Sequence, residues 1–136
     1  MFKRPDIHEA SFFGDLRELQ MALDDGQSPT VANYTGRTAL HTAAANGRLD
    51  VLQVFKERGC PLDNKDKSGC TPLHLASRLG HLDTVKWLID CGADVKARTP
   101  KGRTALSIAQ ANHSQSNATL IVYLQNCNRQ KMSWEL

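Results

Sequence analysis

The sequence predicts an all-α solenoid in which short antiparallel helix pairs stack side by side. Motifs return along the chain at a constant step of 33 residues, and each repeated unit has the pattern turn, helix, turn, helix. Each expected helix has only about 7 to 10 residues, and helices of that length do not persist alone in water. The units must therefore gain their stability by burying apolar faces against one another.

Three sets of residues keep the same register. The segment from Gly36 to His41 returns from Gly69 to His74 and, less completely, from Gly102 to Ser107, with a step of 33 residues each time. The other two sets are single glycines at the same step: Gly14, Gly47 and Gly80, and Gly26, Gly59 and Gly92. Three independent sets in one register indicate true internal repeats.

The first unit, about residues 7 to 32, lacks an opening turn and begins directly with a helix at Ile7. Gly14 is expected to end that helix, because glycine readily adopts the left-handed conformation found after helix ends. A second helix follows. Its apolar residues Leu16, Leu19 and Met21 keep the register, since apolar residues also stand 33 residues later, at Leu49, Leu52 and Val54.

The second and third units, about residues 33 to 65 and 66 to 98, each open with a turn that contains a glycine. In the third unit, Thr71 and Pro72 predict a helix start, since threonine caps free N–H groups and proline suits the first helical position. Gly80 ends this helix. The second helix of the unit is expected to run to Cys91, with apolar residues at helical spacing: Leu82, Val85, Leu88 and Ile89.

The fourth unit, about residues 99 to 127, keeps the sequence Thr104-Ala105-Leu106 of a helix start. Aligning its second helix with that of the third unit requires about three additional residues between His113 and Asn117. We therefore expect a repeat domain at residues 1 to 127 and a tail at residues 128 to 136. Trp134 in this tail suggests docking, either on the array itself or on another molecule.

These units resemble the ankyrin repeat over about residues 7 to 127. The third unit carries the fullest match, from Gly69-x-Thr-Pro-Leu-His-x-Ala through Gly80-His81 to Gly92-Ala93-Asp94-Val95. The second unit has Ala39 where the family usually has proline. The resemblance implies about four repeats, the first and last of them divergent capping units, with helix pairs joined by β-turn or hairpin loops. It also implies a non-enzymatic role in binding other proteins.

Composition and motifs argue against several other classes of function. The longest apolar run, Leu120 to Leu124, has five residues, far fewer than the roughly 20 that a membrane-spanning helix needs. No CxxC pair, no Cys/His cluster with zinc-ligand spacing and no glycine-rich phosphate loop occurs in the sequence. We therefore expect no catalytic residue, no metal and no cofactor. With no signal peptide visible after Met1, the four cysteines are expected to be reduced thiols and the location cytoplasmic or also nuclear.

Three histidines, His8, His41 and His74, fall on the 33-residue register. Equivalent positions in stacked helices lie about 10 Å apart, whereas one metal ion needs all its ligands within about 2 Å of itself. These histidines therefore cannot share an ion. We expect them to form hydrogen bonds with the backbone of neighbouring turns, which is how the family uses this position.

The register also predicts a partner-binding face. Of the nineteen positions at turn tips and first-helix ends, seven are basic and none is acidic, although the rest of the chain has ten basic and fourteen acidic residues. Such a strip attracts an acidic protein or peptide. Nucleic-acid binding through the same strip is the alternative. The expected partner-binding residues are Tyr34, Arg37, Lys65, Lys67, Arg78, Leu79, Arg98, Lys101 and Arg103.

Two further expectations concern the same face and the assembly of the chain. Phe12 and Phe13 fall at the end of the first helix of the first unit. They belong either to the core of a capping unit or to an exposed anchor for a partner. Four units exceed the roughly three that such arrays need for stability, so we expect the chain to be a monomer on its own.

Overall fold

The computed structural model describes residues 4–112 and 117–134, with side chains described up to residue 128. These residues form eight helices and no strand. The helices are α1 (Ile7–Phe13), α2 (Leu16–Asp24), α3 (Ala39–Ala45), α4 (Leu49–Glu57), α5 (Pro72–Leu79), α6 (Leu82–Asp90), α7 (Ala105–Ala111) and α8 (Ala118–Trp134).

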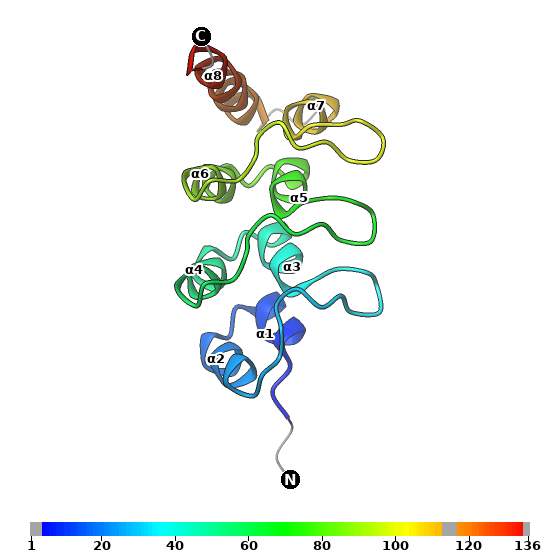
Figure 1. Ribbon diagram of the computed structural model, residues 1–136, viewed down its shortest axis with the longest axis vertical. Coiled ribbons are helices and arrows are strands. Elements are labelled where there is room, and N and C mark those ends of the chain that lie inside the picture. Colours follow the sequence, from blue (N-terminus) through cyan, green and yellow to red (C-terminus); the bar gives the residue numbers. More distant parts are fainter. Residues whose placement is uncertain (1–3, 113–116, 135–136) are drawn as a thin grey trace.

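The helices form four antiparallel pairs stacked along one direction (Figure 1). The pairs α1/α2, α3/α4, α5/α6 and α7/α8 are called repeats 1 to 4. The first helices form one column, in which α3 packs between α1 and α5, and α5 packs between α3 and α7. The second helices form the other column. This arrangement confirms the predicted fold class, a solenoid of stacked helix pairs.

Threonine hydroxyls begin three of the four first helices. The side chains of Thr38, Thr71 and Thr104 accept hydrogen bonds from the backbone N–H groups three residues on, each at 3.3 Å. Such a cap satisfies one of the N–H groups that have no partner inside the helix. Threonine at a 33-residue step therefore starts each of these three helices at the same position within its repeat.

Small and large apolar residues divide the core between the two columns. The first helices bury small residues, with Ala39, Ala43 and Ala44 of α3 fully inaccessible, so neighbouring first helices can approach closely. The second helices supply most of the large buried side chains, of which Phe55 and Leu52 on α4 are fully inaccessible. Together these residues form one hydrophobic core that continues through the four repeats.

The last helix is longer than the sequence analysis indicated. It contains 17 residues and continues through Cys127, where the repeat domain was expected to end, to Trp134. Helix α8 does not end at Cys127 because residues 118–134 contain no glycine or proline that would stop it. Most of the predicted loop between His113 and Asn117, residues 113–116, and the Trp134 side chain lie outside the described part of the structure.

Candidate functional site

Three loops project from the first-helix column, all to the same side of the stack (Figure 1). Each loop closes through the same backbone hydrogen bond, with donors at Asn33, Asp66 and Thr99 and acceptors four residues on, at 2.9 Å in all three. The side chains of these three residues also accept backbone N–H bonds within their own loops. The three loops are therefore short hairpins that share one hydrogen-bonding pattern at equivalent positions.

Consecutive loops touch at their tips. The backbone N–H of Lys67 donates to the carbonyl oxygen of Gly36 at 3.1 Å. One repeat further, a Cβ atom added to Gly69 would lie only 2.4 Å from Cδ of Pro100. Consecutive loops are therefore in contact and form one continuous edge of the molecule.

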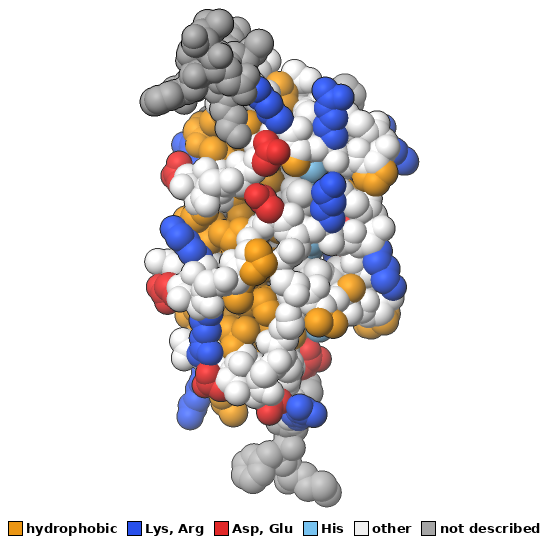
Figure 2. Space-filling view, in the orientation of Figure 1, with side chains coloured by type: hydrophobic (Ala, Val, Ile, Leu, Met, Phe, Trp, Pro, Cys, Tyr) orange, Lys and Arg blue, Asp and Glu red, His pale blue; other side chains and the backbone are white. Residues whose placement is uncertain are grey.

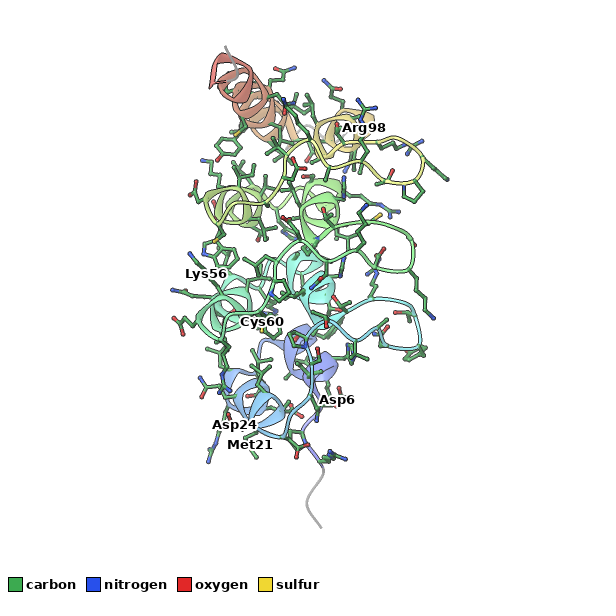
Figure 3. All side chains as sticks on the ribbon, in the orientation of Figure 1. Asp6, Met21, Asp24, Lys56, Cys60 and Arg98 are labelled. Atoms are coloured by element: carbon green, nitrogen blue, oxygen red, sulfur yellow. The ribbon has the colours of Figure 1, made fainter. Side chains whose placement is uncertain are left out.

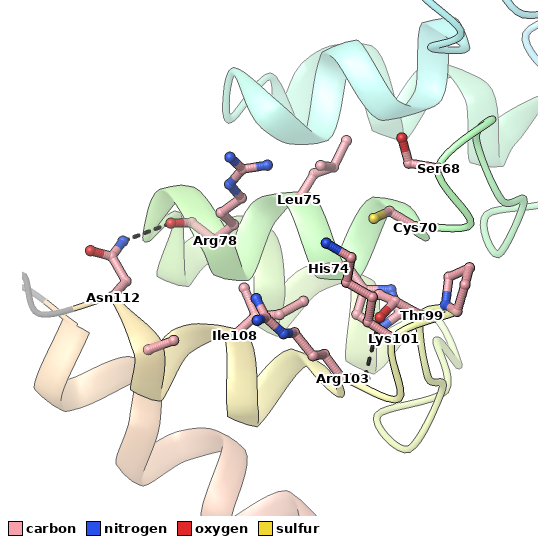
Figure 4. Close-up of a pocket in the computed structure, with 12 residues that line it drawn as sticks. Ser68, Cys70, His74, Leu75, Arg78, Thr99, Lys101, Arg103, Ile108 and Asn112 are labelled. Atoms are coloured by element: carbon pink, nitrogen blue, oxygen red, sulfur yellow. Dashed lines mark hydrogen bonds between the residues drawn. The ribbon is translucent and has the colours of Figure 1, made fainter.

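The space between the loop edge and the first helices contains a groove. It has a volume of about 510 Å³ and lies between α5, α7 and the loops before them. Figure 4 shows its lining: Leu75 and Arg78 come from α5, Ile108 from α7, and Lys101 and Arg103 from the loop between α6 and α7. Leu75, Ile108 and Ala111 give the groove an apolar part, while Arg78, Lys101 and Arg103 bring three positive charges. No acidic side chain is among the lining residues described.

All nine residues predicted from the register to bind a partner are exposed. The structure places Arg78, Lys101 and Arg103 along the groove between repeats 3 and 4. Tyr34, which is 96% exposed, lies on the first loop together with Arg37, outside this groove. The remaining four also lie outside its lining: Lys65, Lys67, Leu79 and Arg98.

The apolar part of the groove was missed in the sequence. Leu75 and Ile108 lie three residues before Arg78 and Ala111 and therefore on the same helix face. That spacing could have indicated them. Leu75 is only 4% exposed, so most of the apolar surface of the groove comes from Ile108 and Ala111. Glu9 occupies the equivalent position in α1, so this face carries a negative charge in repeat 1 and positive charges in repeats 3 and 4.

Surface charge differs between the two sides of the stack. In Figure 2, Lys and Arg side chains follow the loop side over α5 and α7, while the side of the second helices carries both signs of charge. Figure 3 places Arg98 on the side of α7 and Lys56 on the opposite side, where its ammonium lies 5.9 Å from the centre of the Trp87 ring. This contact joins α4 of repeat 2 to α6 of repeat 3.

Two of the three register histidines connect one repeat to the next. His41 Nε2 lies 2.6 Å from the carbonyl oxygen of Cys70, and His74 Nε2 lies 2.8 Å from that of Ala97. Each Nδ1 faces the capping threonine of its own helix; that of His74 also accepts the Thr71 backbone N–H at 3.0 Å. The predicted hydrogen bonds to neighbouring turns are thus present for both. In His8, the buried Nδ1 has no hydrogen-bond partner among the described residues.

Burial lowers the pKa of both His41 and His74, which favours the neutral ring in the folded state. The thiol of Cys70, which also lines the groove, has a raised pKa because of burial and the nearby Asp66 carboxylate. It is therefore protonated at neutral pH, and both nitrogens of His74 are engaged in hydrogen bonds. Cys70 and His74 therefore do not form a thiolate nucleophile with a free base beside it.

Within residues 4–112 and 117–134, His, Cys, Asp and Glu do not gather in any group of three or more that could hold a metal ion. In the same part of the chain, the helices are too short or too polar to cross a membrane. All four cysteines are free thiols.

Comparison with known proteins agrees with this architecture. The family model for ankyrin repeats, in three copies, matches residues 7–99. The chain belongs to the ankyrin-repeat family. Ankyrin repeats generally mediate protein–protein interaction. None of the curated proteins compared with the chain matches it. The family match ends at residue 99, where repeat 4 begins, and in the structure α7 packs on α5 as the earlier first helices pack on one another.

Proposed function

We propose that this ankyrin-repeat chain is a non-enzymatic interaction module that binds an acidic segment of another protein along its basic loop side. The observation that supports this most is the groove between repeats 3 and 4, where Arg78, Lys101 and Arg103 line one cavity without an acidic side chain among the described lining. Carboxylates of a partner would pair with these cations, and arginine offers the planar donors that suit a carboxylate.

The apolar part of the groove refines the chemistry of the partner. Ile108, which is half-buried, and the exposed Ala111 offer aliphatic contact beside the cations, which suits apolar side chains placed between Asp and Glu residues. Single-stranded nucleic acid instead requires aromatic rings on which its bases can stack, and the groove lining contains none. The protein partner is therefore the better-supported reading. In this proposal the chain acts as a monomer in the cytoplasm or nucleus.

A random peptide display library tests the proposal without assuming a sequence. The wild type is compared with a groove variant, Arg78→Glu/Lys101→Glu/Arg103→Glu, and with an outer-helix variant of equal charge change, Arg17→Glu/Lys56→Glu/Lys86→Glu. We expect peptides rich in Asp and Glu from the wild type and the outer-helix variant but not from the groove variant. Affinity of the selected peptides should fall about tenfold or more in the groove variant and should weaken with salt.

Two outcomes would contradict the proposal. If the selected peptides show no acidic bias, or if the groove variant selects them equally well, the three groove cations do not contribute to binding. Tighter binding of a single-stranded oligonucleotide than of any selected peptide at physiological salt would favour the nucleic-acid alternative. Circular dichroism and melting curves of both variants provide the check that the fold is unchanged.

A further inference from the structure

Two adjacent phenylalanines lie exposed at the end of α1. Phe12 and Phe13 are 51% and 64% exposed, and their rings form an edge-to-face pair with centroids 5.0 Å apart at an interplanar angle of 79°. Neither ring belongs to the buried core, so the first of the two alternatives left by the sequence is excluded. Two half-exposed aromatic rings side by side are an unusual feature for a surface and indicate contact with another molecule.

The backbone under this pair is fixed from two sides. Gly14 follows α1 with a φ of +75°, and its N–H group donates to the carbonyl oxygen of Ala10 at 2.9 Å. From repeat 2, Nε of Arg48 donates to the carbonyl oxygen of Phe12 at 3.3 Å. The pair therefore sits on a held helix end, so little backbone ordering would be needed when a partner covers it.

The Phe12–Phe13 pair and the basic groove both lie along the column of first helices. Phe13 is in register with Leu79, two repeats on, and Leu79 is itself 53% exposed next to Arg78 of the groove. The first helices between them pack in sequence, α1 on α3 and α3 on α5. The exposed ends of the first helices thus form one face of the molecule. This face is apolar at repeat 1, where the phenylalanines lie, and cationic at repeats 3 and 4, where the groove lies.

We infer that the acidic partner segment proposed above also carries an aromatic or large aliphatic residue, which docks on the Phe12–Phe13 pair while its carboxylates occupy the groove of Arg78, Lys101 and Arg103. This inference rests on the proposed function and adds where each part of the segment lies along the stack. The acidic part lies over repeats 3 and 4, where the three cations are, and the apolar anchor lies over α1, whose same face carries Glu9.

Repeat spacing fixes the distance between the two parts of the motif. Neighbouring helices pack about 8 to 10 Å apart, and the groove centre lies between the third and fourth first helices. The pair and the groove are therefore separated by about 20 to 25 Å, a length that an extended chain covers with about six to eight residues at about 3.3 Å each. The anchor should accordingly stand about six to eight residues from the acidic block.

Synthetic peptides test this motif directly by fluorescence anisotropy. The first peptide is an acidic block of alternating Glu and Leu, the second adds a tryptophan after a seven-residue Gly/Ser spacer, and the third uses a two-residue spacer. Each spaced peptide is made in two versions, with the tryptophan before or after the block, so that both chain directions across the face are tested. On the wild type, the better orientation of the second peptide should bind about tenfold more tightly than the block alone. The third peptide should show no such gain.

The variant Phe12→Ser/Phe13→Ser should abolish the gain from tryptophan while leaving binding of the acidic block unchanged. A matched control is Met21→Ser on α2, which removes a 53% exposed apolar side chain from the opposite column and should leave the gain intact. Since both phenylalanines are largely exposed, the melting temperature of the double variant should stay close to that of the wild type.

The outcomes separate this inference from the proposed function. The two-part motif is wrong if the block binds through the groove cations but the tryptophan gives no gain in affinity with the seven-residue spacer, or an equal gain with the two-residue spacer. The proposal that the basic groove binds acidic segments then still holds. If the block does not bind, both fail. A concentration-dependent dimer in sedimentation experiments that is lost in Phe12→Ser/Phe13→Ser would show that a second copy of the chain covers the pair, and would also overturn the inference.

Discussion

His81, at the start of α6, reaches back across the repeat interface and places its Nε2 atom 2.8 Å from the carbonyl oxygen of Ala45, at the end of α3. The same relationship joins Arg48 to Phe12 and Asn112 to Arg78, at 3.3 Å and 2.8 Å. The three acceptors are spaced by 33 residues, while the donors are of three different types. The end of each of these first helices is thus held by a polar side chain from the following repeat.

Replacing His81 by alanine should destabilise the interface between repeats 2 and 3. Ala45 is only 5% exposed, so its carbonyl would lose a side-chain donor at a site that water reaches poorly, at a cost of about 1 to 3 kcal/mol. Arg48→Ala is the matched control, because it removes the equivalent bond from an exposed side chain and should cost less than about 1 kcal/mol. Urea denaturation measures both; equal losses would show that burial of the acceptor is irrelevant.

Acidification should lower the stability of the fold through His41 and His74. Burial lowers the pKa of both rings in the folded state, so below pH about 6.5 the unfolded chain binds more protons than the folded one. Stability is therefore complete above that pH and is lost progressively as the pH falls. Protonation would also place a proton on His74 Nδ1, which accepts the Thr71 N–H.

Melting curves between pH 7.5 and pH 5 check this expectation. The melting temperature should decrease on acidification, and its pH dependence should be smaller in His41→Gln/His74→Gln, even though that variant is less stable at neutral pH. A melting temperature that rises toward pH 5, or an unchanged slope in the double variant, would contradict the assignment of these two histidines.

The core of the stack predicts a large effect for Phe55 on α4. This side chain is fully inaccessible, and truncating a buried phenylalanine to alanine costs about 3 to 5 kcal/mol. For a domain of this size, the melting temperature should fall by more than about 10 °C. Met21→Ala, which truncates a half-exposed side chain in the same column, should change stability by less than about 0.5 kcal/mol. Similar losses in both variants would contradict the assigned core.

The repeat register explains why so much of the fold could be predicted. Helix starts at threonine and the glycine after α5 follow from local chemistry, and the 33-residue step then fixes which faces stack. Contacts between repeats could not be predicted in the same way. The bond from Asn112 to Arg78 comes from a repeat whose sequence departs from the register, and α8 runs past Cys127 because nothing in its sequence stops it.

The candidate site was predictable in its charge and not in its shape. Register alone indicated Arg78, Lys101 and Arg103, since turn tips and helix ends repeat with the step. Whether neighbouring basic residues share a groove depends on side-chain packing between loop and helix, which places Lys67 against Gly36 and outside the groove lining. The exposure of Phe12 and Phe13 likewise depends on what packs against α1, and sequence does not determine that.

Loop stacking gives a last prediction with an internal control. Gly69 and Gly102 occupy equivalent positions one repeat apart and have nearly equal φ angles of +78° and +75°. An added Cβ atom would lie 2.4 Å from Cδ of Pro100 at Gly69, whereas at Gly102 no atom lies within 4 Å among the residues described. Alanine at either site incurs the left-handed strain of about 1 to 2 kcal/mol, but only Gly69→Ala must also push the next loop away.

We therefore expect Gly69→Ala to destabilise the fold more than Gly102→Ala, by a difference of about 1 to 3 kcal/mol in urea denaturation. The variant Pro100→Ala/Gly69→Ala should recover part of that difference, because it removes the ring carbons that the new Cβ atom meets. Hydrogen exchange of the loop amides, including that of Lys67, adds a local readout, since loosening of the loop edge should speed exchange there first. Equal stability of the two single variants would mean that the loops do not support one another, and that the basic edge is flexible rather than built by stacking.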